Sequence, residues 1–261
     1  MFSNISAQEV ENVENIFKGT RLVNAQSANL AEQGEMLLLI QHRFGDISNG
    51  LYELFGLDQA SMRIGFEYGF TKNINLGFGR STFFKTYDAF GKIRLMQQNE
   101  IFPFTIVVVA EGSVPTLRNY FPSHTNKFSD KLSSSAQIHL AKIIGNFGFQ
   151  LSPGYLNTGY LPFREEKFST YTLGFGGSAK LSKKVSLNIE YLHNFNNVLS
   201  NTRPLSLGID LDTGGHLFQL IISNSQRMFN QALLTETAGE WSKGNLFFGF
   251  NLIREFKLEY Y

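Results

Sequence analysis

Apolar and polar residues alternate strictly between residues 61 and 80, and this alternation predicts a β-hairpin. A period of two places successive side chains on opposite faces of a strand, so one face of the hairpin is wholly apolar. The opposite face carries Arg63 and Glu67 among glycines, which suits a crowded, wet interior. The apolar face is therefore expected to point outward, into a membrane. The apolar set is Ile64, Phe66, Tyr68, Phe70, Ile74, Leu76 and Phe78.

The same period of two recurs along the chain and predicts about twelve strands. They are expected at 35–44, 61–70, 74–80, 86–97, 101–111, 131–144, 146–156, 168–181, 184–195, 203–212, 216–224 and 244–256. An even number of strands of roughly 9–13 residues matches tilted transmembrane strands, and no apolar run reaches the roughly 18 residues that a transmembrane helix needs. The expected fold class is all-β, a transmembrane antiparallel up-and-down β-barrel of about twelve strands with a short N-terminal segment of helix and loop. A soluble β-protein with an aromatic core is the alternative.

The predicted connections alternate between short and long. Short turns follow every second strand, and long loops follow most of the others, with the connection near residues 84–85 as the exception. Aromatic residues also gather near both ends of the predicted strands. One rim of short turns, one rim of long loops and two aromatic belts are typical of bacterial outer-membrane barrels, whose short turns face the periplasm. We therefore expect the outer membrane, with both termini periplasmic.

Composition narrows the classes of partner and site. The chain has 261 residues, no cysteine and a formal net charge of +1. The lack of cysteine excludes disulfides and thiolate metal sites, and the near-neutral charge argues against nucleic acid as a partner. We expect an N-terminal periplasmic segment at 1–33, whose residues 1–7 are a candidate remnant of an export signal, and the barrel at 34–261.

Several stretches of the first hundred residues resemble a known family. They are ENIFKGTRLVNAQS at 14–27, HRFG at 42–45, YELFGLDQASMRIGFEYG at 52–69 and GFGRSTFFKTYDAFGKIRLMQQ at 77–98. Together they resemble a family of uncharacterised outer-membrane β-barrels from Bacteroidota, a domain of unknown function. The resemblance is specific over roughly 14–98 and loose afterwards. It implies the fold and the outer-membrane location, and it brings no substrate or catalytic residue.

By the parity of the alternation, a set of charged side chains faces the barrel interior. One interpretation is a lumen filled by mutually paired side chains, and the other is a narrow polar path whose charges set selectivity. A barrel of about twelve strands is intermediate between filled eight-stranded and open sixteen-stranded barrels, so its width leaves both interpretations open. The lumen-facing candidates are Arg43, Arg63, Glu67, Asp88, Lys92, Arg94, Lys180, Glu190 and Asp210.

The sequence shows no constellation typical of an enzyme. None of the five histidines lies in a pattern that pairs a base with an orienting acid, no metal-ligand spacing appears, and no cofactor is expected. We identify no catalytic residue and favour a narrow channel or transporter for small polar solutes. The alternative is a non-conducting barrel that anchors or docks a periplasmic or cell-surface protein partner, and an outer-membrane lipid-modifying enzyme is least favoured. Outer-membrane lipid and lipopolysaccharide are the expected surroundings.

Residues 8–33 precede the first strand and are too apolar for a disordered tail. The predicted fifth strand carries apolar residues on both faces, and its surplus face must be covered inside the barrel. We expect the segment to fold back from the periplasmic rim, pack on the fifth strand and plug the lumen, with a basic residue paired to an inward carboxylate such as Glu67 or Glu190. A tether outside the barrel is the alternative. The plug candidates are Phe17, Lys18 and Arg21.

Overall fold

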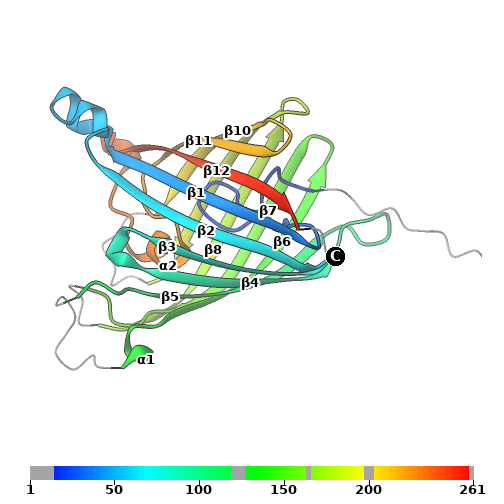
Figure 1. The fold of residues 1–261 in the computed structure, drawn as a ribbon, viewed down its shortest axis with the longest axis horizontal. Helices are drawn as coiled ribbons and strands as arrows, with labels where there is room; N and C mark the ends of the chain where they lie inside the picture. Colours follow the sequence, from blue (N-terminus) through cyan, green and yellow to red (C-terminus); the bar gives the residue numbers. More distant parts are fainter. Residues whose placement is uncertain (1–14, 119–126, 163–165, 197–202, 259–261) are drawn as a thin grey trace, which may run out of the picture.

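Twelve antiparallel strands close into a barrel in the computed structural model, which describes residues 15–118, 127–162, 166–196 and 203–258 (Figure 1). Each strand pairs with its neighbours in sequence order, and β1 pairs with β12 to close the ring, so the predicted all-β antiparallel barrel is confirmed. The strands are β1 (Glu35–Asp46), β2 (Ala60–Thr71), β3 (Ile74–Ser81), β4 (Tyr87–Met96), β5 (Thr105–Val114), β6 (Ser133–Ile144), β7 (Phe147–Asn157), β8 (Ser169–Lys180), β9 (Val185–Asn194), β10 (Leu205–Asp212), β11 (His216–Ser223) and β12 (Phe247–Lys257). The short helices are η1 (Ile47–Gly56), η2 (Phe83–Lys85), α1 (Phe128–Lys131), α2 (Asn230–Thr235) and η3 (Trp241–Lys243).

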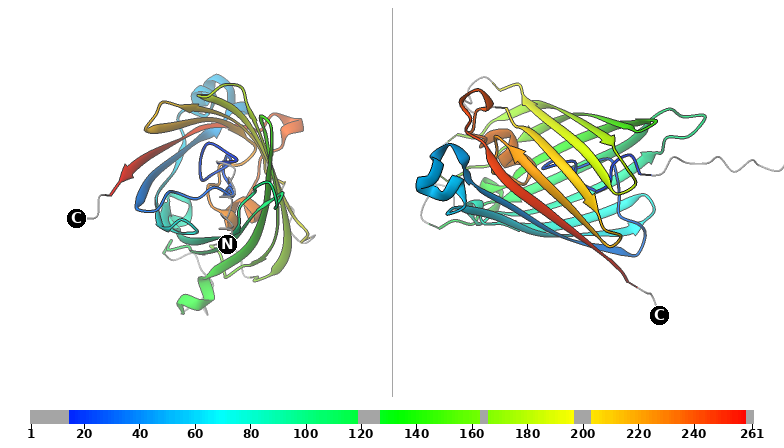
Figure 2. Two further views of the ribbon diagram at one scale, coloured as in Figure 1. Left: turned by 90° about the vertical axis from the view of Figure 1, so that its right-hand side faces the viewer. Right: turned by 90° about the horizontal axis from the view of Figure 1, so that it is seen from above.

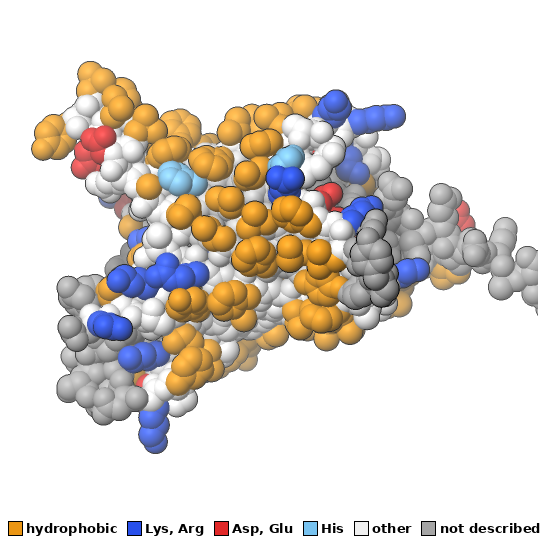
Figure 3. Space-filling view, in the orientation of Figure 1, with side chains coloured by type: hydrophobic (Ala, Val, Ile, Leu, Met, Phe, Trp, Pro, Cys, Tyr) orange, Lys and Arg blue, Asp and Glu red, His pale blue; other side chains and the backbone are white. Residues whose placement is uncertain are grey.

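Side chains alternate between the interior and the exterior along the strands. In β2, Arg63 is 1% exposed, whereas Phe66 is 46% exposed and lies opposite Phe78 of β3. Figure 3 shows a broad field of hydrophobic side chains over the outward face of the strands. So large an apolar exterior is unfavourable in water and suits contact with lipid chains.

The connection between β4 and β5 is longer than the sequence suggested. β5 begins at Thr105 rather than at residue 101, so the connection spans 97–104. Pro103 has no N–H to donate to a strand ladder. The Oδ1 atom of Asn99 accepts hydrogen bonds from the backbone N–H groups of Ile101 at 2.9 Å and Phe102 at 2.7 Å. This side chain holds the segment in a turn, which postpones the start of the strand.

The two rims of the barrel differ in the length of their connections. One rim carries the turns that join β2 to β3, β6 to β7, β8 to β9 and β10 to β11, together with the longer connection 97–104. The opposite rim carries the long segments 47–59 and 224–246 and the described parts of the β5–β6 and β7–β8 connections. The described part of the chain begins near the short-turn rim, and β12 ends there (Figure 1). Within the described ranges no helix is both long and apolar enough to cross a membrane.

Two segments enter the barrel interior from opposite rims. Residues 15–33, here called the N-terminal insert, lie inside the ring of strands as the dark blue segment in Figure 2. Residues 224–246, here called the loop insert, contain α2, whose residues are all buried. The two inserts meet where Ala25 packs with Leu233 and Leu234. The barrel interior is therefore occupied from both ends.

Candidate functional site

The inner end of the N-terminal insert is a tight turn at residues 20–27. The Leu22 N–H donates to the Ala25 carbonyl oxygen at 3.0 Å, and the Ser27 N–H donates to the Thr20 carbonyl oxygen at 3.0 Å. These two bonds satisfy only part of the backbone, so the remaining polar groups of the turn need partners on the barrel wall.

Glu190 of β9 binds the tip of this turn. Its Oε2 atom accepts hydrogen bonds from the backbone N–H groups of Val23 at 3.2 Å, Asn24 at 3.0 Å and Ala25 at 2.8 Å. The glutamate is buried, so these three hydrogen bonds satisfy an acceptor that is shielded from water. One wall carboxylate thus holds three consecutive residues of the insert.

Lys92 of β4 binds the two arms of the turn. Its Nζ atom donates to the carbonyl oxygens of Thr20 at 2.8 Å and Asn29 at 3.2 Å, and it lies 3.2 Å from Oε1 of Glu67. Both Lys92 and Glu67 are fully buried. A buried ammonium group requires such compensation, which here comes from one carboxylate of the wall and two carbonyl groups of the insert.

Arg43 of β1 binds the insert through a side chain rather than the backbone. Its Nη2 atom donates to Oδ1 of Asn24 at 2.7 Å and to Oδ1 of Asn251 at 3.0 Å. Asn251 in turn donates from Nδ2 to the Val23 carbonyl oxygen at 2.8 Å. Residues of β1 and β12, the strands that close the barrel, therefore share a hydrogen-bond network with the turn.

Two glutamines complete the wall of this site. Gln219 of β11 donates from Nε2 to the Leu22 carbonyl oxygen at 3.0 Å and to Oδ1 of Asp210 at 2.9 Å. Gln150 of β7 accepts a hydrogen bond from the Ala28 N–H at 2.7 Å. Ser206 of β10 also accepts a hydrogen bond at Oγ from Nδ2 of Asn24 at 2.8 Å, so seven of the twelve strands contribute a polar side chain to the turn and its flanks.

Arg63 and Asp88 form a pair within the wall. The Arg63 guanidinium donates from Nε to Oδ1 of Asp88 at 2.8 Å and from Nη2 to Oδ2 at 2.5 Å, and its Nη1 donates to Gln41 at 3.0 Å. A Cβ atom on Gly79 would lie 2.2 Å from the Arg63 Nη2 atom. The glycine of β3 therefore leaves the space in which the guanidinium lies.

Apolar side chains fix the part of the insert nearest the short-turn rim. The cluster consists of Ile16, Phe17, Leu22, Ala28 and Leu30 of the insert with Val107, Val109 and Ala141 of the wall. Val107 and Val109 belong to the inward face of β5, the strand whose second apolar face the sequence left without a partner. The insert removes this face from water.

The expected pairing of a basic insert residue with Glu67 or Glu190 is wrong. The Nζ atom of Lys18 lies 3.5 Å from Oδ2 of Asp212 at the short-turn rim and donates to the Lys183 carbonyl oxygen at 2.6 Å. Glu67 and Glu190 are occupied instead by a wall lysine and by backbone N–H groups of the insert.

Arg21 lies deeper and carries its charge without an ion pair among the described residues. Its Nη1 atom donates to the Asn24 carbonyl oxygen at 2.9 Å, and its guanidinium carbon is 5.5 Å from the centre of the Phe90 ring. Burial, and after it the nearby Arg63 guanidinium, lowers the pKa of Arg21 to about 10. Arg21 therefore stays protonated at neutral pH.

The remaining lumen candidates mark the entrance of the insert. Arg94 is half-buried and donates from Nη1 to Oε1 of Gln97 at 3.2 Å. Lys180 ends β8 at the short-turn rim and donates from Nζ to the Asn15 carbonyl oxygen at 3.3 Å. These two residues lie near the short-turn ends of their strands, whereas the other seven candidates are buried in the lumen.

The loop insert is an element that the sequence reasoning missed, because 225–243 was expected only as a long loop between the last two predicted strands. Leu233 and Leu234 pack with Leu156 of β7 and Leu192 of β9. Asn194 donates from Nδ2 to the Leu234 carbonyl oxygen at 2.5 Å. The available signal was the apolar content of 228–234, MFNQALL, within an otherwise polar stretch.

Among the described residues, His139 of β6 is buried beside a serine, an arrangement that occurs in catalytic sites. The Nδ1 atom of His139 lies 2.7 Å from Oγ of Ser152 and 2.7 Å from Nε2 of Gln150. In the described ranges its ring makes no hydrogen bond to a carboxylate, the third member of a nucleophilic triad. The same ranges hold no cluster of three His, Cys, Asp or Glu residues suited to a metal ion.

Solved outer-membrane barrels resemble this structure at low sequence identity. The NanC porin matches with a TM-score of 0.53 at 8% identity, over 86% of this chain and 100% of that chain. OmpF of Salmonella typhi, solved in complex with daunomycin, gives a TM-score of 0.40 at 8% identity, over 85% of this chain and 97% of that one. OmpT of Vibrio cholerae gives a TM-score of 0.41 at 8% identity, over 87% of this chain and 99% of that one. The similarity to the NanC porin shows a shared fold.

None of the curated proteins compared with the chain matches it. Residues 17–256 match the family described as "Membrane bound beta barrel domain" (DUF5777). The match begins inside the N-terminal insert, so the insert is part of the family's domain rather than an addition to it. The chain therefore belongs to the DUF5777 family of membrane-bound β-barrel domains.

Proposed function

We propose that this protein is an outer-membrane channel or transporter for small polar solutes, closed in this structure by its two inserts. The short-turn rim and both termini lie in the periplasm, and the long connections lie outside. The observation that carries the proposal is the way the wall holds the N-terminal insert. Buried polar side chains on seven strands bind atoms of the turn at 20–27 and its flanks.

A barrel whose interior is filled only for stability does not need a wall of buried polar and charged side chains. Apolar packing usually stabilises an interior at least as well as buried charges do. Hydrogen bonds between wall side chains and the insert can be exchanged for hydrogen bonds to water when the insert withdraws, because water satisfies both partners. The wall that remains is polar and suits hydrated solutes.

The apolar cluster at the short-turn rim favours the closed position of the N-terminal insert. Withdrawal of residues 16–30 exposes Val107 and Val109, which is unfavourable in water. The insert is therefore expected to return to its closed position when no solute competes for the wall.

The loop insert closes the opposite half of the path. A cavity of only about 10 Å³ separates Phe229 and Gln231 of the loop insert from Asp88 and Ser133 of the wall. Such a cavity holds about one water molecule, too little for a solute. Full opening thus requires both inserts to move.

Single-channel conductance in planar bilayers tests the proposal. Four forms are compared: the intact chain, a deletion of residues 8–30, a replacement of 226–238 by a short Gly-Ser linker, and the combination of both changes. We expect the intact protein to be nearly silent and the combined variant to conduct with the largest steps. Replacement of 128–131, the helix α1 outside the lumen, is the matched control and is expected to leave the conductance of the intact chain unchanged.

The same experiment distinguishes the channel from the alternative, a non-conducting barrel. Each variant is first checked for a folded barrel by its heat-dependent migration on denaturing gels. A folded combined variant that shows no current in any salt, while a reference porin conducts beside it, overturns the channel and favours a non-conducting barrel that anchors a protein partner.

A further inference from the structure

The connection between β1 and β2 presents large apolar side chains to its surroundings. Tyr52 is 93% exposed and Leu51 is 78% exposed, and three further apolar side chains of the same connection are about half exposed. Isolated apolar residues on a surface need no explanation, but a contiguous set of this size marks a site of contact. The set, here called the η1 patch, consists of Leu51, Tyr52, Leu54, Phe55 and Leu57.

Several polar groups in and beside this connection are hydrogen-bonded. Glu53 accepts hydrogen bonds at Oε2 from Nδ2 of Asn49 at 2.7 Å and from Nε2 of Gln59 at 3.0 Å. Asp46 accepts from the Ser48 N–H at 2.8 Å. Asp46 also accepts at Oδ2 from Nδ2 of Asn245 at 3.0 Å, so hydrogen bonds within the connection and to the loop insert fix the shape of the η1 patch.

Backbone strain accompanies this exposure. Leu54 and Phe55 adopt left-handed conformations, with φ of 46° and 54°, which large L-residues rarely populate. Gly56 approaches β1 so closely that a Cβ atom would lie 2.4 Å from the Gly45 carbonyl oxygen. Strain of this kind persists where the surroundings offset its cost, and it clusters at sites of function. Transfer of the η1 patch out of water would supply that offset.

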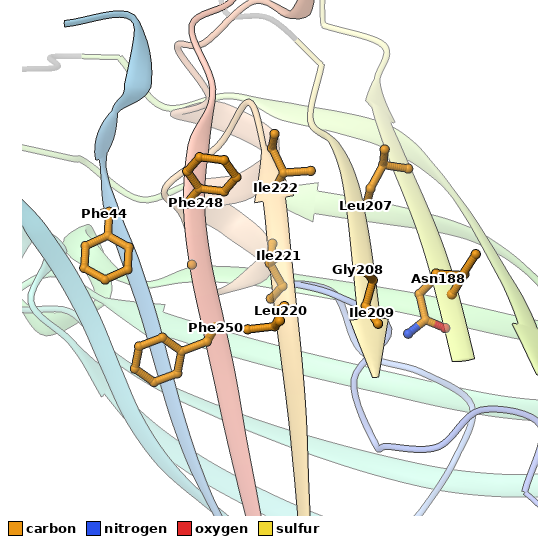
Figure 4. Close-up of a pocket in the computed structure, with 12 residues that line it drawn as sticks. Phe44, Asn188, Leu207, Gly208, Ile209, Leu220, Ile221, Ile222, Phe248 and Phe250 are labelled. Carbon is orange, nitrogen blue, oxygen red and sulfur yellow. The ribbon is translucent and has the colours of Figure 1, made fainter. Parts of the chain in front are cut away.

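The η1 patch continues the lipid-facing surface of the barrel. A groove of about 620 Å³ runs across the outward face of β9 to β12 and ends at Phe44 and Phe248 (Figure 4). Phe44 precedes η1 by three residues. On the side of β1 away from β12, Met62 and Ile64 of β2 are also exposed. Hydrophobic side chains also run along the upper edge of Figure 3 from the barrel to the projecting end of the β1–β2 connection.

We propose that the η1 patch is an interfacial anchor that inserts into the membrane leaflet at the long-loop rim, where lipid acyl chains are its ligand. Its continuity with the lipid-facing surface favours lipid over a soluble protein. Leucine, phenylalanine and tyrosine side chains are those that bind at the boundary of headgroups and acyl chains. This inference is independent of whether the lumen conducts.

A single-tryptophan reporter tests the anchor. Trp241 is the only tryptophan of the chain, so W241F provides a silent background in which Y52W is the reporter. The protein is reconstituted in vesicles of phosphatidylcholine whose acyl chains are brominated near the headgroup. F128W, at an exposed aromatic residue of α1, is the control for water, and Y171W, at an exposed aromatic residue on the outward face of β8, is the control for lipid.

We expect the emission of Y52W to shift to shorter wavelength than that of F128W, to lose most of its intensity to the brominated lipid, and to resist quenching by iodide, as Y171W does. If Y52W instead matches F128W, with strong quenching by iodide and none by bromine, the η1 patch lies in water and the proposal is overturned. L51W is the second reporter if Y52W fails to fold, and the same two outcomes apply to it.

Discussion

Arg63 illustrates the requirements of a buried charge at the scale of one residue. Its guanidinium is satisfied by both oxygens of Asp88 and by Gln41, and it occupies space left by Gly79. Desolvation of such a pair is costly, so the pair as a whole adds little stability. The loss of one partner is a different matter, because it leaves a charge buried and unpaired.

The variant Asp88→Asn is therefore expected to lower the free energy of unfolding by about 3–5 kcal/mol. The double variant Arg63→Met with Asp88→Leu removes both charges and is expected to recover much of that loss. Urea titrations of the protein in vesicles measure both values. Asp58→Asn, at an exposed carboxylate of the β1–β2 connection, is the control and is expected to stay within about 0.5 kcal/mol of the parent. Equal stability of D88N and D58N would contradict the role of the pair.

The N-terminal insert is the element that joins the wall residues into one site, and Glu190 is its central contact. The variant Glu190→Ala removes the acceptor of three backbone N–H groups. A hydrogen bond contributes about 0.5–1.5 kcal/mol net, so the loss of three leads us to expect the open form of the insert to become at least tenfold more populated. The measurement is the rate at which a protease cleaves residues 15–33. Glu100→Ala, in the exposed turn before β5, is expected to leave that rate unchanged.

The base of the insert offers a steric test of the same element. A Cβ atom on Gly69 of β2 would lie 2.0 Å from the Glu32 carbonyl oxygen. This oxygen belongs to the backbone, so it cannot move aside as the end of a flexible side chain could. Gly69→Ala is therefore expected to displace the segment before β1 and to increase both proteolysis and single-channel current. At Gly112 the nearest atom to a Cβ lies 3.6 Å away, so Gly112→Ala is the matched control. Identical behaviour of the two variants would refute the close contact.

At this scale the sequence predicted some elements and missed others for physical reasons. The two apolar faces of β5 indicated an internal partner, because a strand between lipid and a wet lumen needs only one apolar face and the second must be covered. The partners of Lys18 and Glu190 depend on the register around the whole ring, which no local pattern encodes. The loop insert was missed because α2 spans only Asn230–Thr235, too short for a helical period to emerge. The start of β5 was misplaced because the Asn99 turn competes with the strand pattern.

The whole molecule is a barrel with its polar side inward and its apolar side outward. That architecture follows from a period of two repeated over an even number of strands, so the sequence contained nearly all of it. The pairing of β1 with β12 closes the sheet, so that no strand edge is left unpaired. The alternation of apolar and polar residues implies this closure only indirectly. The filling of the lumen depends on which long segments fold inward, and strand periodicity contains no information on that.

The outward face gives the test at this scale. Phe66 of β2 is 46% exposed, and its neighbours across the ladder are Leu38 and Phe78, so it lies in the apolar field that faces lipid. Phe66→Arg is expected to destabilise the folded barrel by about 2–4 kcal/mol if the residue lies near the membrane midplane. The reason is that the guanidinium must leave water for the hydrocarbon region. Asn73→Arg, in the exposed turn between β2 and β3, is the matched control and is expected to be neutral. Urea titrations in vesicles and the heat-dependent gel shift measure both. If Phe66→Arg is tolerated as well as Asn73→Arg, the face that carries Phe66 does not contact lipid.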